Sequence, residues 1–226
     1  MKIIASLCLL LCTNIAFSGA LIHKDEANKT ITIQSRLMFY GEELTPKSLE
    51  DLGESVSLEW NNADQLIRVN NNTYRLHFDV EHTSLSAFEA RFIALSNKNP
   101  RDILIKLSPK NRMNTSYAIQ GKGIINLQTS GDYIATKVLA HEYGHTLGLS
   151  HHSDSVCAQE TSTHPLMCVG MYFVGSDETD ESRAYKVSRV LSKEDINALS
   201  LLLSGLKYNN KGVAELGSGE KRFEKD

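Results

Sequence analysis

The chain has 226 residues, 41% of them hydrophobic and 23% charged, which is typical of an ordinary globular protein with one main core. Its formal net charge is −3 and its sequence pI is about 6.2, so it lacks the overall basic character that favours nucleic-acid binding. We therefore expect no nucleic-acid partner.

Residues 1–20 differ from the rest of the chain. Lys2 is their only charged residue, Ile3 to Leu11 is largely apolar, and small residues follow up to Ala20. This order predicts a signal peptide over residues 1–20 and secretion, into the periplasm if the cell is bacterial. The alternative is an uncleaved membrane anchor, for which the apolar run is short, so we expect no stable membrane association. The polar residues 21–30 are predicted to form a short leader.

The next part of the chain alternates strand and helix patterns. Ile31 to Tyr40 is rich in β-branched and aromatic residues, which predicts a strand. Thr45 and Pro46 are typical of a helix start, and an apolar face follows at Leu49, Leu52, Val56 and Trp60. A turn over Asn70 to Asn72 precedes a second strand, Tyr74 to Val80, in which apolar and polar residues alternate.

Further along, the patterns predict a helix over Ser84 to Ser96, strands over Asp102 to Leu107, Ser116 to Gln120 and Ile124 to Gln128, and a helix from Asp132 to Leu147. This order favours an α+β (mixed α/β) domain with helices packed on a mixed sheet. We place the domain at residues 31–205. Residues 206–226 are charged and poor in apolar side chains, which predicts a flexible tail.

A group of histidines follows the last of these strands. Residues 141–151 read His-Glu-Tyr-Gly-His-Thr-Leu-Gly-Leu-Ser-His. On a helix, His141 and His145 lie one turn apart on the same face and can take two corners of a zinc tetrahedron, with Glu142 close enough to reach a water on the metal. Gly148 can leave the helix through a left-handed conformation, so that His151 becomes a third ligand. Three protein ligands leave one position open, which is typical of a catalytic zinc site.

This motif, H-E-x-x-H-x-x-G-x-x-H, resembles the signature of the metzincin zinc peptidases. The resemblance implies His141, His145 and His151 as ligands and Glu142 as general base. It also implies a methionine turn beneath the zinc, for which Met167 is our candidate and Met171 the alternative. Within the metzincins the chain is most similar to matrixins, which implies a catalytic domain with a twisted, mixed five-stranded sheet, an active-site helix and a C-terminal helix. Leu191 to Leu203 matches that C-terminal helix, with Ser192 as its cap and Asp195 three residues later.

The chain departs from the matrixin pattern after the third histidine. Matrixins usually have serine where this chain has His152, which leaves His152 as a competing ligand. The segment between His151 and Met167 is long and contains Cys157, and we expect an inserted loop. Because an exported chain meets oxidising conditions, a disulfide between Cys157 and Cys168 is expected, with two free buried thiols as the alternative. No cysteine lies between the signal and Cys157, so we expect no inhibitory propeptide cysteine.

Taken together, the sequence predicts a secreted, monomeric zinc-dependent endopeptidase with one catalytic zinc and a protein or peptide substrate. Calcium is common among matrixins, but no calcium loop is evident. By analogy with the family, the substrate is expected along the strand Ser116 to Gln120, for which a plain loop is the alternative. The analogy also implies a specificity pocket beside the zinc, walled by Val169 to Val174. An acidic run at Asp177, Glu178, Asp180 and Glu181 either favours basic substrates or is a solvated loop. The alternative functions are a secreted zinc-containing binding protein and a zinc hydrolase with a non-peptide substrate.

Overall fold

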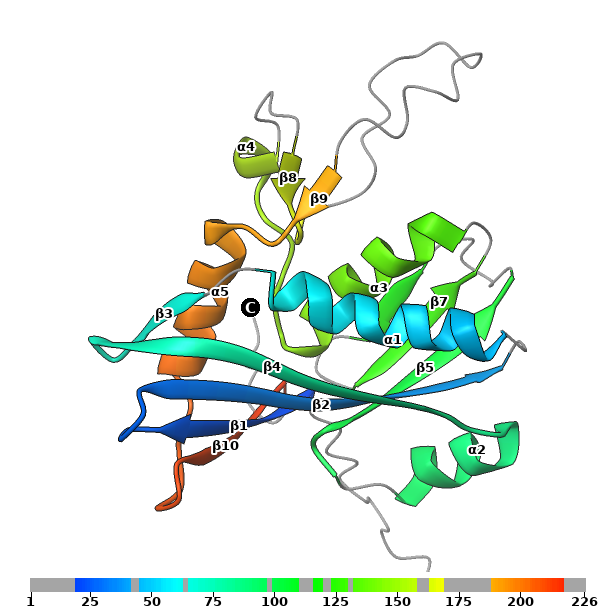
Figure 1. The fold of residues 1–226 in the computed structure, drawn as a ribbon, viewed down its shortest axis with the longest axis horizontal. Coiled ribbons are helices and arrows are strands. Elements are labelled where there is room, and N and C mark those ends of the chain that lie inside the picture. The colour runs from blue at the N-terminus through cyan, green and yellow to red at the C-terminus, as the bar shows by residue number, and fades with distance from the viewer. Residues whose placement is uncertain are drawn as a thin grey trace, which may run out of the picture.

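A computed structural model describes residues 19–41, 45–62, 65–96, 99–109, 116–119, 123–129, 132–157, 163–168 and 188–217 (Figure 1). Strands and helices alternate along most of this chain. In order they are β1 (Ala20–Asp25), β2 (Thr30–Gly41), α1 (Pro46–Trp60), β3 (Leu66–Val69), β4 (Asn72–Ser84), α2 (Ala87–Ser96), β5 (Asp102–Ser108), β6 (Tyr117–Ile119), β7 (Ile124–Gln128), α3 (Asp132–Thr146), α4 (Asp154–Cys157), β8 (Thr163–Pro165), β9 (Ser188–Val190), α5 (Lys193–Ser204) and β10 (Val213–Leu216).

The main sheet has eight strands and both parallel and antiparallel pairs. Its order is β10-β1-β2-β5-β7-β6, and the hairpin β3–β4 joins it through a parallel pairing of β4 with β2. The long strand β2 is central, because it pairs with β1, β4 and β5. The short strand β6 lies at one edge, antiparallel to β7. A separate two-stranded parallel sheet is formed by β8 and β9.

One face of the main sheet carries most of the core. Alternate residues of β2 point to this face, as expected for a strand whose side chains have a period of two; Ile31, Ile33, Leu37 and Phe39 are buried there. Helices α1, α3 and α5 supply the other side of this cluster, with Trp60 and Tyr143 among its largest fully buried side chains. The opposite face of the sheet is covered in part by α2, which packs over Met38 and Leu104 (Figure 1).

Helix α1 forms as its sequence indicates. Thr45 is the cap, and its hydroxyl accepts a hydrogen bond from the Ser48 amide at 3.1 Å, which satisfies one of the free N–H groups of the first turn. The apolar positions Leu52, Val56 and Trp60 are buried against the sheet. The predicted helix and its core-facing side are therefore confirmed.

The five strands predicted for the domain correspond to β2, β4, β5, β6 and β7, but the sheet is larger than predicted. The added strands β1, β3 and β10 are short, and each offers few apolar residues on its own. They are stable as part of the sheet because neighbouring strands satisfy their backbone groups and cover one of their faces.

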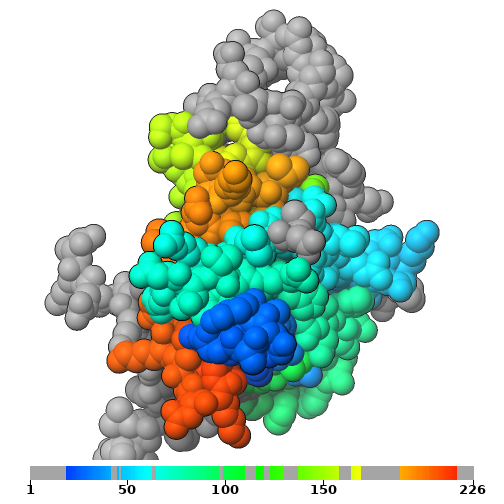
Figure 2. All heavy atoms as spheres, turned by 60° about the vertical axis from the view of Figure 1, so that its left-hand side comes forward, coloured from blue at the N-terminus to red at the C-terminus, as the bar shows by residue number. Residues whose placement is uncertain are grey.

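Both ends of the predicted domain also need correction. Residues 21–25 of the expected leader belong to β1, and residues 213–216 of the expected tail form β10, which pairs antiparallel with β1. In Figure 2 the blue atoms of the N-terminal strands lie beside the red atoms of the C-terminal segment. Ala20, Ile22, Ala214 and Leu216 are buried, so both strands contribute to the core. The domain thus includes Ala20 to Leu216.

Most of the predicted signal peptide, residues 1–18, lies outside the described residues. Gly19 is already held in place: its N–H donates to the Leu216 carbonyl at 2.8 Å, and its own carbonyl accepts from the Ser35 hydroxyl at 2.8 Å. Within the described part of the chain, no helix combines the length and the apolar character needed to span a bilayer.

Candidate metal centre

Helix α3 holds the first two histidines, and its inner face is fixed by aromatic packing. Trp60 of α1 donates a hydrogen bond from Nε1 to the Ala140 carbonyl at 3.1 Å. Its ring lies 5.1 Å from Phe78 and 5.7 Å from Tyr143, measured between centroids. The Tyr143 hydroxyl lies 3.0 Å from the Ser35 hydroxyl. These contacts fix how the helix is rotated on the sheet, and so fix where the histidines of its opposite side point.

The three histidines of the motif meet at their Nε2 atoms. His151 Nε2 lies 3.2 Å from His141 Nε2 and 2.9 Å from His145 Nε2. All three donor atoms lie within 4.8 Å of one another, so one ion can contact them together. Within the part of the chain that the structure describes, His141, His145 and His151 form the group of side chains that could hold a metal ion.

The outer nitrogens of two rings show which atoms are left for a metal. His141 Nδ1 lies 2.7 Å from the Leu166 carbonyl, and His145 Nδ1 lies 2.8 Å from the Leu149 carbonyl. A carbonyl oxygen only accepts hydrogen bonds, so both Nδ1 atoms carry the proton and both Nε2 atoms present a lone pair. Carbonyl partners of this kind orient the histidine ligands of metal sites.

The protonation of the rings agrees with this arrangement. Burial lowers the pKa of His141 to about 3, and it also lowers the pKa of His145 and of His151. The imidazoles are therefore neutral near pH 7, which is the form that binds metal ions. Three neutral imidazoles at adjacent corners suit zinc, which takes nitrogen ligands in tetrahedral geometry.

Gly148 turns the chain so that His151 can reach the other two rings. Its φ is +94°, a conformation that side chains other than glycine rarely adopt. The Leu149 amide donates to the Gly144 carbonyl at 3.0 Å, which ends the helix. His151 follows three residues after Gly148, as the motif spacing indicates.

Glu142 lies between the two helical ligands in sequence and is only 6% exposed. Burial raises its pKa to about 7, and a hydrogen bond from the Ala118 amide of β6 acts in the opposite direction. A carboxylate with a pKa near neutrality can both accept and return a proton at physiological pH.

Met167 packs beneath the metal-binding helix. It is fully buried, and a side chain placed on Gly144 would collide with the Met167 sulfur atom. The glycine between the two helical histidines therefore makes room for this methionine. Met171, the alternative for the methionine turn, lies outside the described residues, as do Val169 to Val174 and the acidic residues 177–181.

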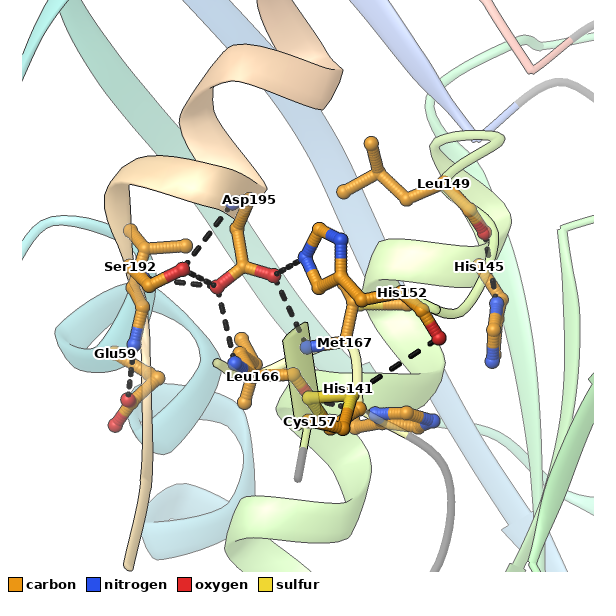
Figure 3. Close-up of polar contacts among 12 residues, drawn as sticks. Glu59, His141, His145, Leu149, His152, Cys157, Leu166, Met167, Ser192 and Asp195 are labelled. Atoms are coloured by element: carbon orange, nitrogen blue, oxygen red, sulfur yellow. Dashed lines mark hydrogen bonds and ion pairs between the residues drawn. A yellow bond between two sulfur atoms is a disulfide. The ribbon is translucent and has the colours of Figure 1, made fainter. Parts of the chain in front are cut away.

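Asp195 joins the segment of Leu166 and Met167 to α5 (Figure 3). Its side chain is 0% exposed. One carboxylate oxygen accepts from the Leu166 amide at 3.0 Å and from the Ser192 amide at 2.8 Å; the other accepts from the Met167 amide at 3.1 Å. The capping box predicted for Ser192 and Asp195 is present, but sequence reasoning missed the contacts to the turn. No local pattern could have indicated them, because they join residues 28 and 29 positions apart.

His152 does not take part in the metal group. Its Nε2 donates to Asp195 at 2.8 Å, so the ring points away from the three histidines (Figure 3). Its own backbone N–H donates to the Met167 carbonyl at 3.1 Å. The competing ligand that the sequence left open is thus a partner of the buried Asp195 carboxylate.

Cys157 and Cys168 form a disulfide with their Cα atoms 5.7 Å apart. The bond connects the short helix α4 to the residue that follows Met167. It closes the segment that we interpret as an inserted loop, and both cysteines are buried.

Comparison with known proteins gives only distant structural likenesses. No protein-family model matches the chain, and no curated protein matches it. A zinc-dependent peptidase from Methanocorpusculum labreanum is similar over 73% of this chain and all of its own, with 10% identity and a TM-score of 0.43. An archaemetzincin from Methanopyrus kandleri is similar over 74% of this chain and 94% of its own, with 16% identity and a TM-score of 0.38. Likenesses of this size carry no argument about function, which must come from the site itself.

Proposed function

We propose that this protein is a zinc-dependent endopeptidase of the metzincin type. The observation that carries the proposal is the convergence of the Nε2 atoms of His141, His145 and His151, two of them with Nδ1 bound to a carbonyl, beside a buried glutamate. Structural zinc sites have four protein ligands, whereas three leave a position for water and substrate.

When bound, zinc would supply Lewis acidity, which polarises a carbonyl group and makes water more acidic. Glu142 takes the proton of the attacking water and returns it to the leaving amine, a role that suits its raised pKa. The Ala118 amide holds the carboxylate in place. The Leu166 and Leu149 carbonyls fix the orientation of the His141 and His145 rings.

A substrate peptide would lie along β6. This strand is at the edge of the sheet, packs against α3, and contacts Glu142 through Ala118. An exposed edge can pair with an extended peptide, which brings a substrate backbone next to the metal centre. The strand expected over Ser116 to Gln120 is present as Tyr117–Ile119, which supports this placement.

We also propose that the chain is exported and that the signal peptide is removed before Gly19. Cleavage after Ala20 would delete two residues that pair with Leu216 and Ser35 or lie buried in the sheet. N-terminal sequencing of protein recovered from the medium or periplasm tests this. A mature chain that begins at Gly19 is expected, and a chain that begins at Leu21 would contradict the proposal.

The decisive experiment measures metal and cleavage on the same sample. We would express residues 19–226, determine zinc by elemental analysis, and digest a mixed peptide library before and after treatment with a chelator. The proposal predicts about one zinc per chain and cleavage that chelation abolishes and added zinc restores.

The variant His145→Ala provides the control, since it removes one of the three converging ligands. It should bind zinc at least about a hundredfold more weakly and lose cleavage with it. Full zinc loading without cleavage of any peptide would overturn the peptidase proposal while keeping the metal site. A wild-type protein that binds no zinc would overturn both.

A further inference from the structure

The C-terminal turn of α3 is covered by two glycines, Gly19 before β1 and Gly217 after β10. Thr146 is the last residue of this helix and is buried. A Cβ atom added to Gly19 would lie 2.1 Å from the Thr146 carbonyl oxygen, and one added to Gly217 would lie 2.3 Å from the same oxygen. Atoms that are not bonded do not approach so closely, so a side chain at either position would force the backbone to move. The two glycines therefore pack their backbones directly on the end of the metal-binding helix.

Gly19 is joined to α3 a second time, through buried hydroxyl groups. The Ser35 hydroxyl donates to the Gly19 carbonyl at 2.8 Å, and the Tyr143 hydroxyl lies 3.0 Å from the Ser35 oxygen. Because the Ser35 proton is used toward Gly19, Tyr143 is the donor to Ser35. Tyr143 and Thr146 are three residues apart and lie on the same side of α3. Gly19, which also donates its N–H to the Leu216 carbonyl at 2.8 Å, thus connects β10 to two points of this helix.

The turn that these contacts hold determines how two of the three histidines meet. His145 directly precedes Thr146, and its Nδ1 lies 2.8 Å from the carbonyl of Leu149, three residues after Thr146. His151 follows the same turn, and its Nε2 lies 2.9 Å from His145 Nε2. A shift of the Thr146 backbone would therefore move His145 relative to His151. Zinc sites tolerate little of this, because the zinc–nitrogen distance is confined to about 2.0–2.1 Å.

We propose that the pairing of β1 with β10 regulates the affinity of the metal centre for zinc. Through Gly19 and Gly217, this pairing holds the end of α3 in the position in which His145 and His151 converge. The two glycines are positioning residues, which act on the metal through the helix. The inference rests on the proposed function and adds to it a control of zinc binding by strands that supply no ligand.

The test compares two glycines that stand at opposite ends of β10. Gly217 has a φ of +87° and faces the Thr146 carbonyl, whereas Gly212 has a φ of +72° and a Cβ added to it would lie 2.3 Å from the Lys24 carbonyl oxygen. Gly217→Ala and Gly212→Ala thus introduce the same kind of strain, and both should lower the melting temperature of the metal-free protein. The Kd for zinc is measured by competition with a chelator. We expect it to rise about tenfold in Gly217→Ala and to stay within about twofold of the wild-type value in Gly212→Ala.

A milder pair of variants keeps the test informative if Gly217→Ala does not fold. Tyr143 and Tyr74 are both fully buried, and the hydroxyl of each makes a hydrogen bond, to Ser35 and to Glu26 respectively. Tyr143→Phe removes the link between α3 and Gly19 but keeps the ring. It should raise the zinc Kd about threefold, in keeping with the loss of one hydrogen bond. Tyr74→Phe is the matched control and should leave the zinc Kd unchanged.

Two results would overturn the inference: wild-type zinc affinity in both Gly217→Ala and Tyr143→Phe, or an equal loss of affinity in each variant and its control. Cleavage of a peptide library by the same samples separates this from the proposed function. Cleavage by the wild-type protein, with equal zinc affinity in all variants, would overturn the regulatory role alone. Zinc binding that depends on Gly217 and Tyr143, without cleavage of any peptide, would overturn the peptidase function alone.

Discussion

Two buried carboxylates, Glu142 and Asp195, differ in the number of hydrogen bonds that they accept. Asp195 accepts hydrogen bonds from the amides of Leu166, Met167 and Ser192 and from the side chains of Ser192 and His152. Glu142 accepts from the Ala118 amide, and burial dominates its pKa and raises it to about 7. Both residues are buried: Asp195 is 0% exposed and Glu142 is 6% exposed.

The difference separates a structural role for Asp195 from a reactive role for Glu142. A carboxylate that accepts hydrogen bonds from several donors is held in one geometry. A buried carboxylate with fewer donors changes protonation more easily, as proton transfer requires. We infer that the Asp195 region is the rigid floor of the site and that Glu142 is its reactive group. The following predictions test this contrast, from the largest expected effect to the smallest.

Glu142→Gln should remove activity and leave the fold intact. We expect kcat/KM to fall by roughly 10²–10⁴-fold, because an amide cannot take the proton of the attacking water. Zinc content should stay at the wild-type level, as Glu142 is not one of the three converging ligands. The melting temperature of the metal-free protein should stay the same or rise, because the variant no longer buries a carboxylate whose charged form is disfavoured. Wild-type turnover by this variant would show that another group is the base.

Asp195→Asn should have the opposite profile, with a large effect on stability. The substitution leaves amide and hydroxyl donors facing a neutral group, and we expect a loss of roughly 3–5 kcal/mol in the free energy of unfolding. Urea denaturation measures this loss. Glu194→Gln, an exposed neighbour in the same helix turn, is the control and should change stability by less than about 0.5 kcal/mol. An equally small effect for both variants would remove the distinction between floor and reactive group.

Breaking the disulfide should weaken the floor by a smaller amount. The bond joins residues 11 positions apart. Its loss in Cys157→Ala/Cys168→Ala is expected to cost about 3 kcal/mol, because the unfolded chain regains the freedom of the closed loop. Thermal unfolding with and without reductant measures the effect in the wild-type protein, and the double variant should not respond to reductant. A wild-type protein that is insensitive to reductant would contradict the prediction.

Gly144→Ala should produce the smallest effect of the series. The added methyl group meets the Met167 sulfur and the Trp60 ring, and we expect a cost of about 1–3 kcal/mol. Because the methionine is the nearest obstacle, combining it with Met167→Ala should cost less than the sum of the two single changes. A double-mutant cycle based on urea denaturation measures this coupling. Strict additivity would mean that the two residues do not share the space beneath the metal.

Much of the fold follows from local sequence patterns. Helix α1 and strand β2 were predictable because a capping residue and regular apolar spacing mark them independently of the rest of the chain. The strands β1 and β10 were not, because each consists of few residues with a polar neighbourhood. Strand β1 also pairs with its chain neighbour β2, but the pairing of β1 with β10 spans nearly the whole chain, and such long-range pairing leaves no local signal.

The residues of the candidate site also divide into those that local sequence patterns predicted and those that they did not. The three histidines, Glu142 and Gly148 occupy one short segment whose spacing determines helical geometry, so their convergence could be anticipated from sequence. For Asp195, the sequence indicated only its local role in the cap of α5. Groups contributed by distant segments require the tertiary structure.

The pairing of β1 with β10 has a consequence for the order of events during synthesis. The first strand of the domain gains its outer neighbour only when residues 213–216 are available, so the sheet is completed only after these residues have been made. Until then, β1 presents an open edge and the end of α3 near Gly19 lacks its final support. The eight-stranded sheet is therefore complete only when strands from both ends of the described domain are present together.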